Sequence, residues 1–144
     1  MLCTTRSVVK VMSDNKDNSY LIYNKVKDFE DYSEKYIINA IPSVHRHIRI
    51  HFVDETYNLL HHLFLAYHDD RNNQRRKYLI ECLTSVSLID HYITKLRKII
   101  DDDKSLKKIQ LNASKLDEIS YKLTIVRSLI YKWKTKIDKE ISSN

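Results

Sequence analysis

The most constraining feature of this sequence is that it contains no glycine and only one proline in 144 residues. Tight β-hairpins need residues at positive φ, which glycine usually supplies. Phosphate-cradling loops, dinucleotide-binding turns and nucleophile elbows are also built on glycine. The sequence therefore argues against these folds and enzyme motifs. Because it also has few helix breakers, it predicts an all-α protein.

The chain is long enough for one domain with one substantial core. Residues 1–18 show no sustained apolar pattern, which predicts a mobile N-terminal tail. Residues 19–141 contain four stretches in which apolar side chains recur at steps of three and four, as in amphipathic helices. No helix can bury such a stripe alone, so we predict an antiparallel up-down-up-down four-helix bundle over 19–141. The rival, a long coiled-coil dimer, is disfavoured by the proline and by two charged polar breaks.

Each predicted helix has a core seam that can be read from the sequence. In chain order the seams are Ile22, Val26, Phe29, Ser33, Tyr36 and Ala40; Phe52, Leu59, Leu63 and Ala66; Leu79, Cys82, Val86, Ile89, Ile93, Leu96 and Ile100; and Leu116, Ile119, Leu123, Val126, Ile130, Trp133 and Ile137. The second helix has a further stripe of Val53, Tyr57, Leu60, Phe64 and Tyr67, so we expect it to be the most buried. Tyr20, Tyr23 and Tyr32 fall outside the first seam and could serve an oligomer interface.

The helix boundaries follow from breakers and caps. The first helix must end by Ile41, and Pro42 fits the first position of the second helix, which should run to Tyr67. Residues 68–74 form a polar turn, and the acidic run that begins at Asp101 ends the third helix. A partly helical link through Leu106 and Ile109 then leads to Asn112, a predicted N-cap.

The cysteine content and hydropathy suggest where the protein works. Cys3 and Cys82 lie far apart and form no C-x-x-C pair, which favours a reducing compartment over a disulfide scaffold or a structural zinc site. No window approaches 18 consecutive apolar residues, and the N-terminus lacks the apolar stretch of a signal peptide. We expect a soluble, cytoplasmic protein with no membrane contact.

Positive charge is concentrated in the second half of the chain. The net charge is +6, and residues 71–100 hold seven Lys or Arg against two acids, whereas residues 1–70 hold eight against ten. This balance favours an anionic partner such as nucleic acid. The candidate nucleic-acid-binding residues are Arg71, Arg75, Arg76 and Lys77 at the start of the third helix, Lys132 and Lys136 near the end of the fourth, and Arg46 and Arg49 as secondary contacts at one end of the bundle.

The helix dipole disfavours one of the two main groups of cations and favours the other. Cations at a helix N-terminus oppose the dipole, so the Arg71–Lys77 cluster is locally unfavourable, which favours phosphate binding. The alternative is a solvated helix start that keeps the protein soluble. Cations near a helix C-terminus are favoured by the dipole, so a solvated face explains Lys132, Lys136 and Lys139 at least as well.

The stretch I-P-S-V-H-R-H-I-R-I-H-F, residues 41–52, admits three interpretations: a strand, a metal site or a basic contact. Helical seams on both sides argue against the strand. His47 and His51 share one helical face, but no third ligand or E-x-x-H pair accompanies them, so we predict no metal and no cofactor. No catalytic set can be assembled from the residue spacing either, because Cys82 falls on a core seam. We therefore do not expect an enzyme.

Four motifs occur in an order and spacing that resemble one family. They are I-P-S-V-H-R-H, L-L-H-H-L-F-L-A-Y, K-K-I-Q-L-N-A-S-K-L and R-S-L-I-Y-K-W-K, and the similarity covers roughly Tyr20 to Lys136. The chain resembles the basic four-helix-bundle proteins that include Avd, the accessory variability determinant of diversity-generating retroelements. That family also includes proteins encoded by intervening sequences in large-subunit ribosomal RNA genes. Its members commonly carry glycines that are absent here.

The resemblance to Avd implies a non-enzymatic accessory factor. Such a protein would assemble as a positively charged homo-oligomeric ring, with a pentamer as one candidate. It would bind a reverse transcriptase and template RNA or cDNA. Three alternatives remain: a ribosomal RNA intervening-sequence protein, an oligomeric protein-interaction module without a nucleic-acid role and, last, an enzyme or metal carrier.

Overall fold

The computed structural model describes residues 19–102 and 111–143. The predicted tail, 1–18, and the predicted link through Leu106 and Ile109 lie outside these residues. Four long helices account for most of the described chain: α2 (Ser19–Tyr32), α3 (Arg46–His68), α4 (Asn72–Asp102) and α5 (Ala113–Ser142). Three short helical turns join α2 to α3: η1 (Ser33–Ile37), η2 (Ile38–Ala40) and η3 (Ser43–His45). No strand occurs in these ranges, so the all-α prediction is confirmed.

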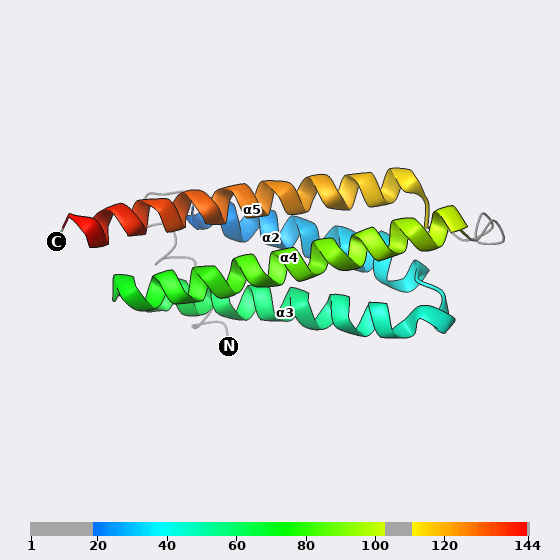
Figure 1. The fold of residues 1–144 in the computed structure, drawn as a ribbon, viewed down its shortest axis with the longest axis horizontal. Helices are drawn as coiled ribbons and strands as arrows, with labels where there is room; N and C mark the ends of the chain where they lie inside the picture. The colour runs from blue at the N-terminus through cyan, green and yellow to red at the C-terminus, as the bar shows by residue number, and fades with distance from the viewer. Residues whose placement is uncertain (1–18, 103–110, 144) are drawn as a thin grey trace.

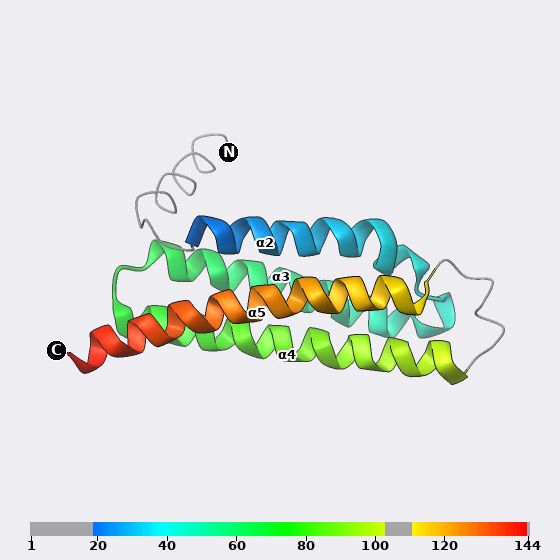
Figure 2. The same ribbon diagram turned by 90° about the horizontal axis from the view of Figure 1, so that it is seen from above.

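The four long helices lie side by side along one long axis (Figure 1). α4 packs against both α3 and α5, whereas α2 packs mainly on α5 and only lightly on α3. Seen from above, α5 runs between α2 and α4, with α3 behind (Figure 2). Cross-helix contacts fix which ends meet: Arg76 near the start of α4 pairs with Asp138 near the end of α5, and Arg97 near the end of α4 pairs with Asp117 near the start of α5.

The seams predicted for α4 and α5 form much of the core. Every predicted seam residue from Leu79 to Leu96 is buried, and Ile100, near the end of α4, is half-buried. On α5 the predicted residues are buried except Trp133, which is half-buried and stacks on the buried Tyr67 ring at a centroid distance of 4.9 Å. The predicted cap is confirmed too, because Asn112 Oδ1 accepts a hydrogen bond of 2.9 Å from the Lys115 backbone N–H.

The seam predicted for the first helix is wrong at its C-terminal end. Ile37 is fully buried there, whereas Tyr36 and Ala40 are only half-buried. The reason is the π-helical turn η1, in which the Ile38 N–H donates to the Ser33 carbonyl, five residues back. This wider turn contains one residue more than an α-helical turn. The side-chain register therefore moves from Tyr36 to Ile37.

The second stripe predicted for α3 is only partly buried. Val53, Leu60 and Phe64 are half-buried, and Tyr57 is 57% exposed. α2 reaches this stripe at Phe64, whose ring centroid lies 5.9 Å from that of Tyr23 on α2, so the stripe is covered in part. Of the three tyrosines proposed for an interface, Tyr20 is exposed, whereas Tyr23 and Tyr32 are half-buried against the core.

Three predicted boundaries also move. Pro42 has an extended ψ of 145° and precedes the short turn η3, so it does not start the α-helix, and α3 begins only at Arg46. The polar turn is shorter than 68–74, because α4 already begins at Asn72. Asp101 and Asp102 belong to α4 rather than to a break. Within the described ranges, no helix is long and apolar enough to cross a membrane.

Candidate nucleic-acid interface

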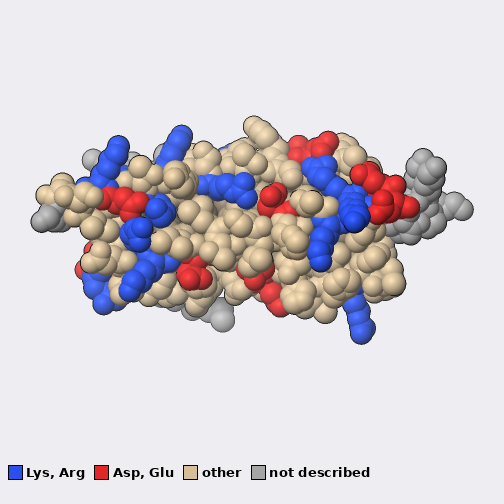
Figure 3. Space-filling view, viewed as in Figure 1, with Lys and Arg blue, Asp and Glu red and all other residues tan. Residues whose placement is uncertain are grey.

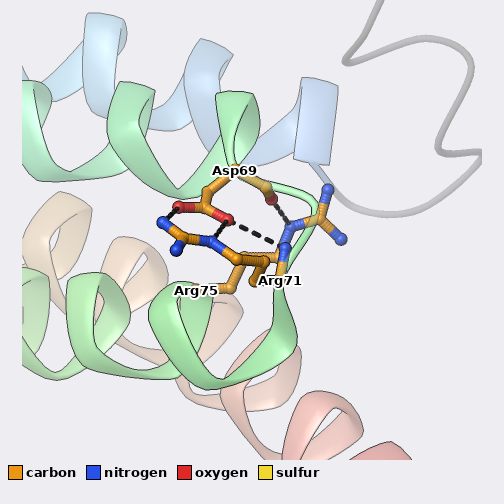
Figure 4. A network of polar contacts seen from close by, with 3 residues as sticks. All are labelled: Asp69, Arg71 and Arg75. Atoms are coloured by element: carbon orange, nitrogen blue, oxygen red, sulfur yellow. Dashed lines mark hydrogen bonds and ion pairs between the residues drawn. The ribbon is translucent and has the colours of Figure 1, made fainter.

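The turn between α3 and α4 is organised around Asp69. Its carboxylate accepts hydrogen bonds from the Arg71 backbone N–H at 2.8 Å and from the Arg71 guanidinium at 3.1 and 2.8 Å. The Arg75 guanidinium donates to the Asp69 backbone carbonyl (Figure 4). The hydrogen bonds from Arg71 lower the pKa of Asp69 to about 2. Arg71 and Arg75 thus hold the turn, although the Arg71 side chain remains 69% exposed.

A second acid connects the start of α4 to the end of α5. Asp138 accepts hydrogen bonds from Lys134 Nζ at 2.9 Å and from Arg76 Nε at 2.7 Å. These bonds, that of Lys134 first, hold the pKa of Asp138 below its ordinary value. Asn72 adds a hydrogen bond of 3.1 Å to Glu140. The charge of Arg76 is therefore partly compensated within the molecule.

The remaining cations at this end of the molecule point into solvent. Lys77, Lys132 and Lys136 are exposed. Lys77 and Lys132 form no ion pair with any part of the chain that the structure describes. On α5, Lys132 and Lys136 lie roughly 120 to 160° around the helix axis from Asp138, because each residue turns an α-helix by about 100°. They therefore occupy a different face of α5 from the one that meets Arg76.

The structure divides the predicted residues between two ends of the molecule. We call the six residues Arg71, Arg75, Arg76, Lys77, Lys132 and Lys136 the basic end. Arg46 and Arg49 are at the opposite end of α3, whose 23 residues span roughly 35 Å. Arg46 is exposed and Arg49 is half-buried. Figure 3 shows Lys and Arg gathered toward both ends of the face formed by α4 and α5, with Asp and Glu among them.

The histidines considered as metal ligands have other neighbours. The His51 ring stacks on Tyr92 at 5.7 Å with an interplanar angle of 7°, and His47 lies 6.3 Å from the His45 ring. Within residues 19–102 and 111–143, no three His, Cys, Asp or Glu side chains gather in a way that could hold a metal ion. The acidic run that begins at Asp101 continues to Asp103, which lies outside the described residues.

Cys82 occupies the core position that its seam predicts. Its side chain is fully buried, and the thiol donates to the Leu59 carbonyl at 3.6 Å. Burial raises the pKa of the thiol to about 12. A nucleophilic cysteine needs a lowered pKa and access to solvent, so this environment suits packing rather than catalysis.

Sequence reasoning missed the acids that accompany the basic end. Asp69 lies next to the cluster and could have been noticed as a capping partner, since short polar side chains commonly bond to backbone N–H groups two residues on. Asp138 is 62 residues from Arg76, and no local pattern connects them. Its position in the same predicted helix as Lys132 and Lys136 gave no sign that it faces α4.

Together, the fold and the basic end define a basic protein that is helical over the described residues and has exposed cations gathered at the basic end. No family model, curated protein or solved structure matches the chain.

Proposed function

We propose that this chain is a non-enzymatic accessory protein that binds nucleic acid through its basic end. The observation that carries the proposal is the group of exposed cations around the start of α4 and the end of α5, with Lys77 and Lys132 unpaired among the described residues. Phosphate contacts need several clustered cations that can release counterions. The antiparallel up-down-up-down bundle belongs to the same proposal and is supported by the ion pairs that link α4 to α5 near both ends.

The contacts at the basic end suggest a division of labour among its cations. Arg71 and Arg75 fix the α3–α4 turn through Asp69, and Arg76 fixes α4 to α5 through Asp138. Lys77 and Lys132 then extend from these fixed helix ends into solvent. Lysines that contact phosphates position a nucleic-acid strand without recognising its base sequence. We therefore expect binding that depends on strand charge rather than on base sequence.

The partners in the proposal come from the resemblance to Avd: a reverse transcriptase, its template RNA or cDNA, and further copies of the chain in a ring. Exposed apolar side chains support an assembly of copies. Ile50 and Tyr57 on α3 are 53% and 57% exposed, and Tyr121 and Tyr131 on α5 are 63% and 59% exposed. Tyrosine is enriched at the cores of protein interfaces. Ile50, Tyr57 and Tyr121 lie outside the basic end, whereas Tyr131 is next to Lys132 and borders it.

A double variant tests the nucleic-acid part of the proposal. Lys77→Glu with Lys132→Glu reverses two exposed charges that have no described ion pair, so it should leave the helices intact. We expect a loss of affinity of about tenfold or more for a single-stranded RNA or DNA in fluorescence anisotropy at low salt. Charge reversal at Arg75 or Arg76 is a poorer choice because it also removes the contacts to Asp69 or Asp138.

The matched control is Lys27→Glu, since Lys27 is an exposed lysine on α2 outside the basic end. An equal loss of affinity per reversed charge in the control and in the double variant would mean that only net charge matters, which would contradict a localised interface. The retroelement context has its own test. A neighbouring reverse transcriptase gene with near-identical template and variable repeats is expected, whereas a location inside a ribosomal RNA operon would contradict it.

A further inference from the structure

An open pocket of about 460 Å³ lies at the end of the molecule opposite the basic end. It is formed where α3 begins and α4 ends. From α3 and the turn before it come His45, His47 and Ile48, and from the last turns of α4 come Lys95, Lys98 and Ile99, with Asp102 also in the lining. The volume falls in the range of small-molecule sites. The pocket includes His45 and His47 of the I-P-S-V-H-R-H stretch, to which the nucleic-acid proposal gives no role.

The charge balance of the pocket is positive. Lys95 and Lys98 form no ion pair with the part of the chain that the structure describes. Asp102 is four residues after Lys98, at the usual spacing for a helical ion pair, yet the two do not pair in this structure. Each imidazole adds at least one N–H donor whatever its protonation state. Two ammonium groups and two imidazoles thus face the space with one carboxylate.

The beginning of α3 increases this imbalance. Its first turn contains no acid, and its N-cap, His45, makes no side-chain capping hydrogen bond. The N-terminal end of a helix dipole is positive, and most sequences place an acid or a capping oxygen there. Here the sequence places His45, Arg46, His47 and Arg49 instead. An anion bound in the pocket would supply the negative charge that this helix end and the two lysines lack.

The apolar part of the lining comes from the two isoleucines. Ile48 is 2% exposed and belongs to the core, and the half-buried Ile99 packs against that core. Isoleucine side chains cannot contribute to binding a hydrated inorganic ion, but they can cover the face of a ring. The pocket therefore suits a ligand with one anionic group and one flat apolar body.

We propose that this pocket binds a phosphomonoester on an aromatic body, of the nucleoside monophosphate class. The ammonium groups of Lys95 and Lys98 and the imidazole N–H groups bind the phosphate, the base lies over Ile48 and Ile99, and the Asp102 carboxylate is an acceptor for a sugar hydroxyl. On α4, Lys95 of this site lies roughly 27 Å along the helix axis from Lys77 of the basic end, so nucleotide binding here does not depend on the binding of long nucleic-acid strands there.

Isothermal titration calorimetry with adenosine 5′-monophosphate, adenosine and inorganic phosphate tests the proposal. We expect the nucleotide to bind more tightly than either fragment. Lys95→Gln with Lys98→Gln should weaken nucleotide binding by about tenfold or more, because each ammonium–phosphate hydrogen bond is charge-assisted. His47→Gln should weaken it as well, and both variants replace exposed side chains, so thermal unfolding should stay close to that of the wild type.

The control variant is Lys77→Gln, which changes the basic end and leaves this pocket intact. It should bind the nucleotide like the wild type while losing affinity for long nucleic-acid strands. Loss of binding at one site can therefore be distinguished from loss of binding at the other. Equal binding of adenosine and the nucleotide would overturn the phosphate assignment, and equal binding of inorganic phosphate would overturn the role of the isoleucines. No nucleotide binding at millimolar concentration, or full binding by the Lys95→Gln, Lys98→Gln variant, would overturn the site.

Discussion

At the scale of single residues, burial determines what Cys82 can do. Its pKa is raised to about 12 by burial, and the reactive form of a cysteine is the thiolate. In a Cys3→Ser background, we expect Cys82 to resist a thiol reagent such as an aromatic disulfide in the folded protein and to react fully in denaturant. The absorbance of the released thiol measures this. Rapid, stoichiometric labelling without denaturant would contradict a packed Cys82.

Asp69 gives a residue-scale prediction about pH. Its ordinary pKa of 3.8 is lowered to about 2 in the folded protein, mainly by the side-chain hydrogen bond from Arg71. A carboxyl with a lowered folded pKa contributes stability that is fully present above its unfolded pKa and is lost as the pH falls through its folded pKa. We expect Asp69→Asn to lower stability at neutral pH and to flatten the decline between about pH 4 and pH 2.

Urea unfolding at a series of pH values measures that decline. The exposed neighbour Asp70 provides the matched control, because it accepts no hydrogen bond among those described for the turn. Asp70→Asn should leave the slope between pH 4 and pH 2 nearly unchanged. The account of the turn would be wrong if the Asp70 variant flattened the profile and the Asp69 variant did not.

At the scale of elements, the π-helical turn at the end of α2 decides which residues enter the core. We expect Ile37→Ala to lower the free energy of unfolding by about 2–5 kcal/mol, as is usual for a fully buried isoleucine. Ile38→Ala removes the same atoms from a half-buried position and should cost less. Chemical denaturation of both variants compares them. A larger loss for Ile38 than for Ile37 would contradict the shifted register.

The helices also differ in how well their buried residues could be predicted from the sequence. The seams of α4 and α5 agree with the structure because apolar residues continue at steps of three and four from Leu79 to Leu96 and from Leu116 to Ile130. The end of α2 could not be predicted in this way. A π-helical turn changes only the backbone hydrogen-bond spacing, and Ser33–Ile37 carries no residue pattern that signals it. The extent to which the second stripe of α3 is buried was also unpredictable, because it depends on where α2 packs against it.

At the scale of the whole molecule, the sequence identifies cations but not how they are distributed. The sequence predicts both Arg76 and Lys77 as nucleic-acid contacts, yet of the two only Arg76 forms an ion pair with an acid on α5. The sequence also could not show that Arg46 and Arg49 lie a helix length away from Arg71, or that Lys95 meets His45 across a pocket. These relations depend on which helix ends meet, and that is a property of the packed molecule.

The central claim, that this molecule binds nucleic acid by phosphate contacts at its basic end, is tested most directly by the salt dependence of binding. The measurement is the slope of log K against log salt concentration for a single-stranded oligonucleotide. We predict a steep negative slope for the wild type, and a slope shallower by about 1.4 for Lys77→Gln with Lys132→Gln, since each contact to a single strand contributes about 0.7. No binding at about 50 mM salt, or an unchanged slope in the variant, would contradict the account.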